Sequence, residues 1–118
     1  MSRRPIRQLL EDIAERIRRI DRHMRGIDRD AFLADEKTSD SVVRNLEVIG
    51  EAAARLPTSF RDRHPEVPWR RIVGLRNRIV HAYFDVDLEL VWAIVVRELP
   101  ELEAQVISLS IKTKNKTA

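Results

Sequence analysis

The stretch "IRQLLEDIAERIRRIDRHMRGI", residues 6–27, decides the fold class of this chain. Its apolar residues follow the i, i+3, i+4, i+7 rule, and charged residues fill the other positions. This spacing places the apolar side chains on one stripe of an α-helix and the charges on the opposite face. Pro5 suits the first turn of such a helix, and Gly26 is placed to end it. The stripe consists of Ile6, Leu9, Leu10, Ile13, Ile17, Ile20, Met24 and Ile27.

Three further stretches carry a similar apolar stripe. The chain has only three glycines and five prolines, and such sparse turn residues favour long helices over a many-stranded sheet. We therefore predict an all-α fold, an antiparallel bundle of four to five helices. The expected later helices are residues 37–56, ended by Pro57, residues 69–84, opened by Pro68, and residues 88–109, where Pro100 permits a kink; a polar connector with a turn of helix after Asp28, and a loop with one short turn after Pro57, join them.

The length and composition indicate one domain. With 118 residues the chain can bury a single core, which we assign to residues 1–111, and residues 112–118 are expected to form a flexible basic tail. It has no cysteine, so a disulfide or a thiolate metal site is excluded. The N-terminus lacks an apolar signal segment, and no stretch approaches the ~18 apolar residues of a membrane span. A cytoplasmic protein without a membrane partner is expected.

The positive charge is concentrated in one part of the chain. The net charge is +3, and the eighteen arginines far outnumber the four lysines. A guanidinium group is the better planar partner for phosphate, so the pattern gives a mild indication of nucleic-acid binding. The concentrated group consists of Arg61, Arg63, His64, Arg70, Arg71, Arg76, Arg78 and His81, against only Asp62 and Glu66.

The segment "GLRNRIVHAYFDVD", residues 74–87, interrupts an apolar run with polar residues. On a regular helix from residue 69 to residue 84, Arg76 falls inside the apolar stripe and should be at least partly desolvated. A buried guanidinium without a partner is very costly, so it must meet an acid, a polar cavity or a ligand. Glu47 and Glu51 are the candidate acids, and a purely structural ion pair with one of them remains an open alternative.

The other polar residues of this segment do not share a face with Arg76. Asn77 and His81 are i, i+4 neighbours on the opposite side of the regular helix, whereas Tyr83 lies on the Arg76 side. Arg76 and His81 can act together in two ways. Either the helix distorts near its C-terminal end, or two copies of the chain meet at a two-fold axis and line one groove with both residues.

The spacing Arg76, four residues, His81, one residue, Tyr83 resembles the R-x4-H-x-Y signature of the HepT-like toxins, which belong to the HEPN superfamily of ribonucleases. The resemblance extends over nearly the whole chain, through three ordered blocks. These are "AFLADEKTSDSVVRNLEVIGEAA" (residues 31–53), "VPWRRIVGLRNRIVHAYFDVD" (residues 67–87) and "VWAIVVRELPEL" (residues 91–102). The motif shows no departure from the family pattern.

The resemblance implies a homodimer, formed through the motif-bearing helix, in which two motifs build one composite site at the subunit interface. It implies a metal-independent endoribonuclease without a cofactor, the toxin of a type VII HepT/MntA toxin–antitoxin system. Arg76 and His81 would be catalytic and Asn77 supporting. The partner, an MntA-type nucleotidyltransferase antitoxin, would neutralise the toxin by AMPylation of Tyr83. From the basic segment we add Arg70 and Arg78 as expected contacts to RNA phosphates.

The chemistry agrees with this assignment. Metal-free RNA cleavage needs a base for the 2′-hydroxyl, an acid for the 5′-oxygen and a cation near the crowded phosphorus. Histidine as a residue type can act as base or acid near neutrality, and arginine supplies a permanent positive charge, which are the roles that His81 and Arg76 would fill. Two other readings stay open, because a fold does not determine a function. The chain could be a non-catalytic helical subunit that presents Tyr83 or a nucleotide to a nucleotidyltransferase, or a structural dimerising bundle.

Overall fold

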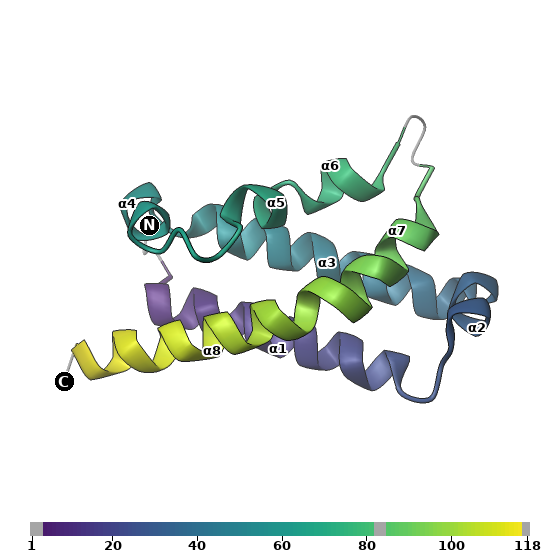
Figure 1. The fold of residues 1–118 in the computed structure, drawn as a ribbon, viewed down its shortest axis with the longest axis horizontal. Coiled ribbons are helices and arrows are strands. Elements are labelled where there is room, and N and C mark those ends of the chain that lie inside the picture. Colours follow the sequence, from purple (N-terminus) through teal and green to yellow (C-terminus); the bar gives the residue numbers. More distant parts are fainter. Residues whose placement is uncertain (1–3, 82–84, 117–118) are drawn as a thin grey trace.

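The computed structural model describes residues 4–81 and 85–116, and within them the chain forms helices and no strand. The colours of Figure 1 follow the chain through four helical stretches that run in alternating directions along the long axis. In order these elements are α1 (Ile6–Met24), α2 (Arg29–Ala34), α3 (Glu36–Arg55), α4 (Thr58–Arg63), α5 (Trp69–Val73), α6 (Leu75–Ile79), α7 (Leu88–Ala93), a π-helical turn (Ile94–Glu98) and α8 (Leu99–Lys116). The prediction of an all-α antiparallel bundle is confirmed.

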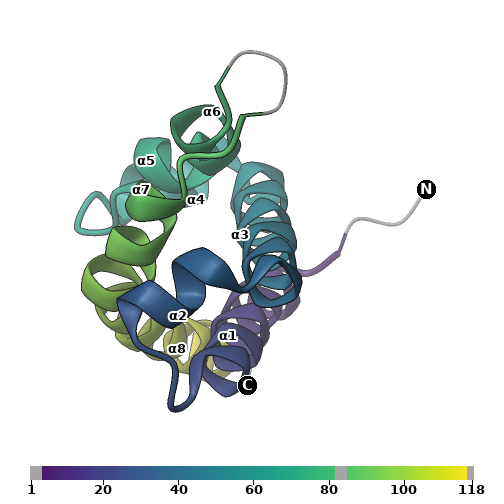
Figure 2. The same cartoon turned by 90° about the vertical axis from the view of Figure 1, so that its right-hand side faces the viewer.

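The long helices pack around one core. Helix α1 contacts both α3 and α8, and α5 and α6 pack against α3. Figure 2 shows the helices enclosing the interior, with α2 across the end that carries the start of α7. Measured over the Cα atoms, the molecule extends 47 × 31 × 28 Å. Within the described part of the chain, every helix is too short or too polar to span a membrane.

Helix α1 has the stripe that the sequence predicts. Six of its residues are buried, all on one face: Leu9, Leu10, Ile13, Ala14, Ile17 and Ile20. The helix ends at Met24, and Gly26 then adopts a positive φ of 74°, a conformation that a residue with a Cβ rarely adopts. Gly26 therefore ends the helix as expected.

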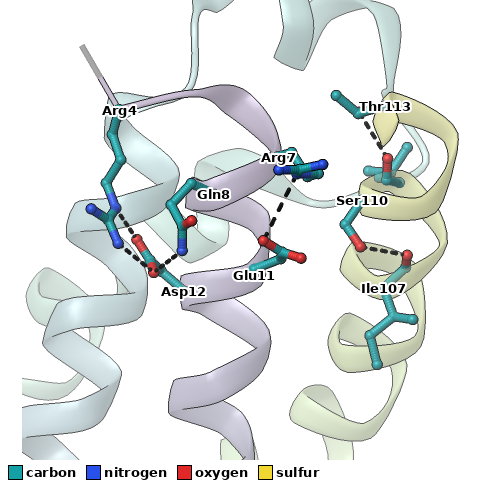
Figure 3. Close-up of polar contacts among 9 residues, drawn as sticks. Arg4, Arg7, Gln8, Glu11, Asp12, Ile107, Ser110 and Thr113 are labelled. Atoms are coloured by element: carbon teal, nitrogen blue, oxygen red, sulfur yellow. Dashed lines mark hydrogen bonds and ion pairs between the residues drawn. The ribbon is translucent and has the colours of Figure 1, made fainter. Parts of the chain in front are cut away.

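The first turns of α1 and the last turns of α8 lie side by side at the end of the bundle far from α6 (Figures 1 and 3). Here Arg4 and Gln8 both point toward Asp12. The Nε of Arg4 lies 2.6 Å from Asp12 Oδ2, and Gln8 Nε2 donates to Asp12 Oδ1 at 3.2 Å. The hydrogen bond from Arg4 holds the pKa of Asp12 below its ordinary value. Asp12, in the second turn of α1, thus has both Arg4 and Gln8 as partners.

Aspartate side chains start the next two helices. Asp28 accepts a hydrogen bond from the Ala31 N–H at 2.8 Å and begins α2, the turn of helix predicted after Asp28. Asp35 caps α3 by accepting from the Thr38 N–H, and the Thr38 hydroxyl donates to its second oxygen at 2.7 Å. Pro57 follows the C-terminal end of α3, and the short α4 fills the predicted loop.

The expected single helix over residues 69–84 is wrong. The chain breaks at Gly74 (φ −89°, ψ 12°), so α5 and α6 are separate five-residue helices, and α6 ends at Ile79. Val80 is extended (φ −106°, ψ 121°) and forms an isolated antiparallel bridge with Val86. The prediction of a longer helix is wrong because the periodicity of apolar residues does not reveal the pairing of Val80 with Val86, a residue beyond the expected helix.

The last helical stretch is continuous but irregular. A π-helical turn at residues 94–98 precedes Pro100, which cannot donate a backbone hydrogen bond. Ile94 and Val95 are buried in this turn, and Trp92 just before it is half-buried and packs against the core. Helix α8 then continues to Lys116, where the sequence predicts a tail from residue 112. Local bonds such as that from the Thr113 hydroxyl to the Leu109 carbonyl oxygen (2.8 Å) accompany the continuation.

Candidate active site

The short helix α6 is placed by a close approach to α3. Leu75 and Ile79 are buried and anchor one face of α6 in the core. On α3, Gly50 faces the turn before α6: a Cβ atom there would lie 3.0 Å from the Ile72 carbonyl oxygen and 3.5 Å from that of Val73. Only a glycine permits this approach without movement of the backbone. The position of α6 is therefore fixed by tertiary contacts.

Arg76 follows the buried Leu75 and points to solvent. Its side chain is 58% exposed, and its Nε lies 3.7 Å from Oε2 of Glu47 on α3. The predicted desolvation of Arg76 is therefore wrong within one chain: Ile72, Leu75 and Ile79 are buried, whereas Arg76 is exposed. Of the two candidate acids, Glu47 is the partner that the structure gives, and Glu51 is exposed. A long, exposed ion pair of this kind contributes little stability and leaves the guanidinium accessible.

His81 lies beyond the helix, on the bridged segment. Two backbone hydrogen bonds flank the Val80–Val86 bridge: the His81 N–H donates to the Asp85 carbonyl oxygen at 2.7 Å, and the Asp87 N–H donates to the Ile79 carbonyl oxygen at 2.8 Å. Because the chain leaves the helix before His81, the expected i, i+4 relation with Asn77 does not exist. A distortion at the C-terminal end of the helix, the first of the two expected solutions, is thus present within one chain.

Asp87 contacts the His81 imidazole. Nε2 of His81 lies 3.6 Å from Asp87 Oδ2, and the two side chains are 55% and 40% exposed. The other oxygen, Asp87 Oδ1, accepts a hydrogen bond from the Leu90 N–H at 3.1 Å and caps α7. The contact with His81 was not predicted from the sequence. A prediction that Val80 pairs with Val86 would have placed Asp87 close to His81. The expectation of one continuous helix over residues 69–84 excluded that pairing.

Arg78, an expected phosphate contact, is held by another group. Its Nη1 and Nη2 donate to the two carboxylate oxygens of Glu98 at 3.0 and 2.8 Å, and only 20% of its side chain is exposed. Arg71 Nη2 adds a third contact to Glu98 at 3.3 Å. The hydrogen bond from Arg78 lowers the pKa of Glu98, and the same bond raises the pKa of Arg78. Arg78 therefore fixes α6 to the π-helical turn.

The remaining predicted residues divide into two groups. Arg70 and Asn77 are both exposed, and neither side chain makes an ion pair or hydrogen bond within the part of the chain that the structure describes. Tyr83 lies outside the described residues. Arg70 and Asn77 are thus available to a ligand, and their predicted roles stay predictions.

An open groove lies beside Val86 and Leu88, just after the motif. It has a volume of about 620 Å³ and runs between α2, α3 and the start of α7. Its apolar lining includes Val43 and Leu88, and its acids include Asp40 and Glu47, the partner of Arg76. These carboxylates would repel a phosphate chain. Over residues 4–81 and 85–116, no group of three or more His, Asp or Glu side chains is arranged to hold a metal ion.

Known proteins share this chain's sequence over most of its length. The family model described as "Ribonuclease HepT-like" matches residues 13–109. The "Probable ribonuclease HepT" of Thermococcus cleftensis is 42% identical over 103 residues, which cover 87% of this chain and 94% of that protein. A protein named "Putative RNase" in Caldanaerobacter subterraneus subsp. tengcongensis is 38% identical over 108 residues, covering 92% of this chain and 96% of that protein. No solved structure matches significantly. The chain belongs to the HepT-like ribonuclease family.

Proposed function

We propose that this chain is a cytoplasmic, metal-independent endoribonuclease in which Arg76 and His81 carry the reaction. The observation that supports this most is the accessibility of the pair: a guanidinium 58% exposed and an imidazole 55% exposed, five residues apart on one short segment. The relatives named as ribonucleases support the substrate class. An enzyme that acts on a large substrate such as RNA needs its catalytic groups at the surface.

Each side chain has a chemical part in the proposed reaction. His81 removes the proton of the 2′-hydroxyl, the 2′-oxygen bonds to phosphorus, and the bond from phosphorus to the 5′-oxygen breaks while that oxygen takes a proton from an acid. Arg76 exchanges its long contact with Glu47 for the non-bridging phosphate oxygens, whose charge grows in the transition state. Asn77, which follows Arg76 in the chain, and the exposed Arg70 on α5 supply further polar contacts.

The acid in this reaction comes from a second copy of the chain. One chain offers one His81, and a general acid and a general base are both required. We propose a homodimer formed through α6, in which His81 of the partner subunit protonates the 5′-oxygen. An equal pair of motifs at a two-fold axis provides both groups from one sequence.

As the toxin of a type VII toxin–antitoxin pair, the chain would be switched off at Tyr83. An MntA-type nucleotidyltransferase joins the α-phosphorus of ATP to the Tyr83 hydroxyl oxygen, and pyrophosphate leaves. Tyr83 is the only tyrosine of the chain and follows His81 by two residues. The added AMP is a bulky anion, which would exclude RNA and attract the cation meant for phosphate.

One assay tests the nuclease. Purified protein is incubated with RNA in EDTA, beside Arg76→Ala, His81→Ala and two matched controls on the exposed face of α1, Arg18→Ala and His23→Ala. We expect cleavage by the wild type and both controls and none by the site variants. Cleavage that survives in both site variants would indicate a contaminating nuclease. No cleavage by any form would refute the proposal and favour the non-catalytic subunit that binds a nucleotidyltransferase.

A further inference from the structure

Asp87 lies close enough to His81 to influence which nitrogen of its imidazole carries the proton. The bridge between Val80 and Val86 is a non-hydrogen-bonded antiparallel pair, so His81 lies opposite Asp85 and diagonally across from Asp87 on one face. A diagonal neighbour is within reach of a long or aromatic side chain. The observed separation of 3.6 Å between His81 Nε2 and Asp87 Oδ2 follows from this register.

We propose that Asp87 is the positioning residue of the site: its Oδ2, 3.6 Å from Nε2, favours the neutral His81 imidazole with the proton on Nε2 and leaves Nδ1 as the atom that takes the proton of RNA. This inference rests on the proposed nuclease function and adds to it the atom that reacts. A carboxylate is negatively charged and accepts hydrogen bonds only, so at this distance it favours the tautomer in which Nε2 carries the proton. When Nδ1 is protonated during the reaction, the carboxylate also stabilises the imidazolium.

The carboxylate is itself held in place by the start of α7. Its Oδ1 accepts from the Leu90 N–H at 3.1 Å, so rotation that would carry Oδ2 away from His81 also breaks the cap. Asp85, the other acid on this face, is exposed, and its carbonyl oxygen rather than its carboxylate binds His81. Of the cations that precede His81 in the chain, Arg78 pairs with Glu98 and Arg76 pairs with Glu47 on α3. Asp87 is therefore the charged side chain in contact with the imidazole among the described residues.

One substitution separates the cap from the contact. Asparagine caps helices as well as aspartate does, so in Asp87→Asn the amide oxygen keeps the Leu90 N–H. The amide NH₂ then takes the place of Oδ2 and can only donate to Nε2. The imidazole must move its proton to Nδ1, the nitrogen that the reaction needs free. The fold is expected to stay while the imidazole has the wrong tautomer.

The experiment measures tautomer and rate in the full-length chain. Imidazole ¹⁵N chemical shifts report the protonated nitrogen of each histidine, and steady-state cleavage of RNA gives kcat and KM. We compare the wild type, Asp87→Asn and the matched cap variant Asp28→Asn, which retains an equivalent cap on α2. His64, which lies near Glu66 and stacks on Phe60, is the internal reference for the shifts.

We expect the His81 proton of Asp87→Asn to move toward Nδ1, with kcat about 10-fold lower and KM within about twofold. Asp28→Asn and the His64 shifts should match the wild type. Unchanged His81 shifts in Asp87→Asn overturn the proposal whatever the rate, and so does a changed tautomer with a wild-type kcat. If the wild type does not cleave RNA, the nuclease proposal fails, and the ¹⁵N shifts alone still decide whether Asp87 sets the tautomer.

Discussion

Arg78 and Glu98 join the motif helix to the π-helical turn through two parallel hydrogen bonds, Nη1 to Oε1 at 3.0 Å and Nη2 to Oε2 at 2.8 Å. The pair spans twenty residues of sequence and lies about half-buried. Bidentate arginine–carboxylate pairs of this kind specify an orientation as well as a distance. The orientation of α6, and with it that of Arg76, therefore depends on an acid in the last helical stretch.

We expect Glu98→Gln to destabilise the fold by about 1 kcal/mol at neutral pH, since Glu98 is over a third exposed and solvent screens the pair. The pKa of Glu98 is lowered in the folded state, so its contribution is present above the pKa of the unfolded chain and is lost as the pH falls through the folded pKa. Denaturation of both proteins at pH 7 and below about pH 4 measures this. The difference should shrink in acid, and a constant difference would contradict the ion pair as its cause.

Gly50→Ala should destabilise the protein by about 1–2 kcal/mol. The new Cβ would meet two backbone carbonyl oxygens at 3.0 and 3.5 Å, which costs more than the ~1 kcal/mol of helix propensity that alanine adds. Denaturant unfolding measures the change, with the exposed Ala54→Ser on the same helix as a control. Because the added methyl group pushes α6 away from α3, cleavage should also fall. Equal or higher stability would show that α3 and α5 separate freely.

Glu47→Gln should lower the KM for RNA about threefold with little change in kcat. Glu47 is the anion that competes with phosphate for Arg76, and the Nε–Oε2 distance of 3.7 Å marks a weak pair that does not fix the guanidinium. Cleavage kinetics at low salt test this, beside Glu11→Gln, an exposed acid of α1. A fall in kcat would instead assign Glu47 the orientation of Arg76.

Tyr83→Phe should leave cleavage largely intact and make the protein resistant to its antitoxin. Phenylalanine has no hydroxyl to accept AMP but keeps the ring. Cleavage is measured before and after incubation with the nucleotidyltransferase and ATP, and the mass of the protein reports AMP. If the partner still neutralises Tyr83→Phe through its transferase activity, the switch lies elsewhere.

A dimer with a single intact His81 should cleave much more slowly than one with two. The experiment mixes differently tagged wild-type and His81→Ala chains and isolates the mixed dimer. Acid and base then come from one imidazole, which cannot serve both roles in one step. A full rate in the mixed dimer would remove the division of roles between subunits.

The sequence predicts the long elements well and the motif segment poorly, for a physical reason. Helix α1 could be predicted from the sequence because its amphipathic stripe is continuous along the chain and long. The position of His81 depends instead on the end of α6 at Ile79 and on the bridge from Val80 to Val86. Pairing of this kind depends on the tertiary environment, which a helical wheel omits. The residue types of the site were readable, but its geometry was not.

The same limit applied to the partners of the site residues. Glu47 was one of the two acids expected to meet Arg76, and that pair is present. The pair of Arg78 with Glu98 was missed, since the π-helical turn shifts Glu98 out of regular register. The contact of Asp87 with His81 was missed because the segment between them was read as helix.

Helix α6 has five residues, too few to be stable on its own in water. It is held in place by the close approach at Gly50, which is synthesised before it, and by the ion pair with Glu98, which is synthesised after it. During synthesis the segment that contains Glu98 must therefore leave the ribosome before Arg78 can form its pair with it. A C-terminally truncated chain would carry the whole motif yet lack the Arg78–Glu98 pair, and with it one of the two supports of α6.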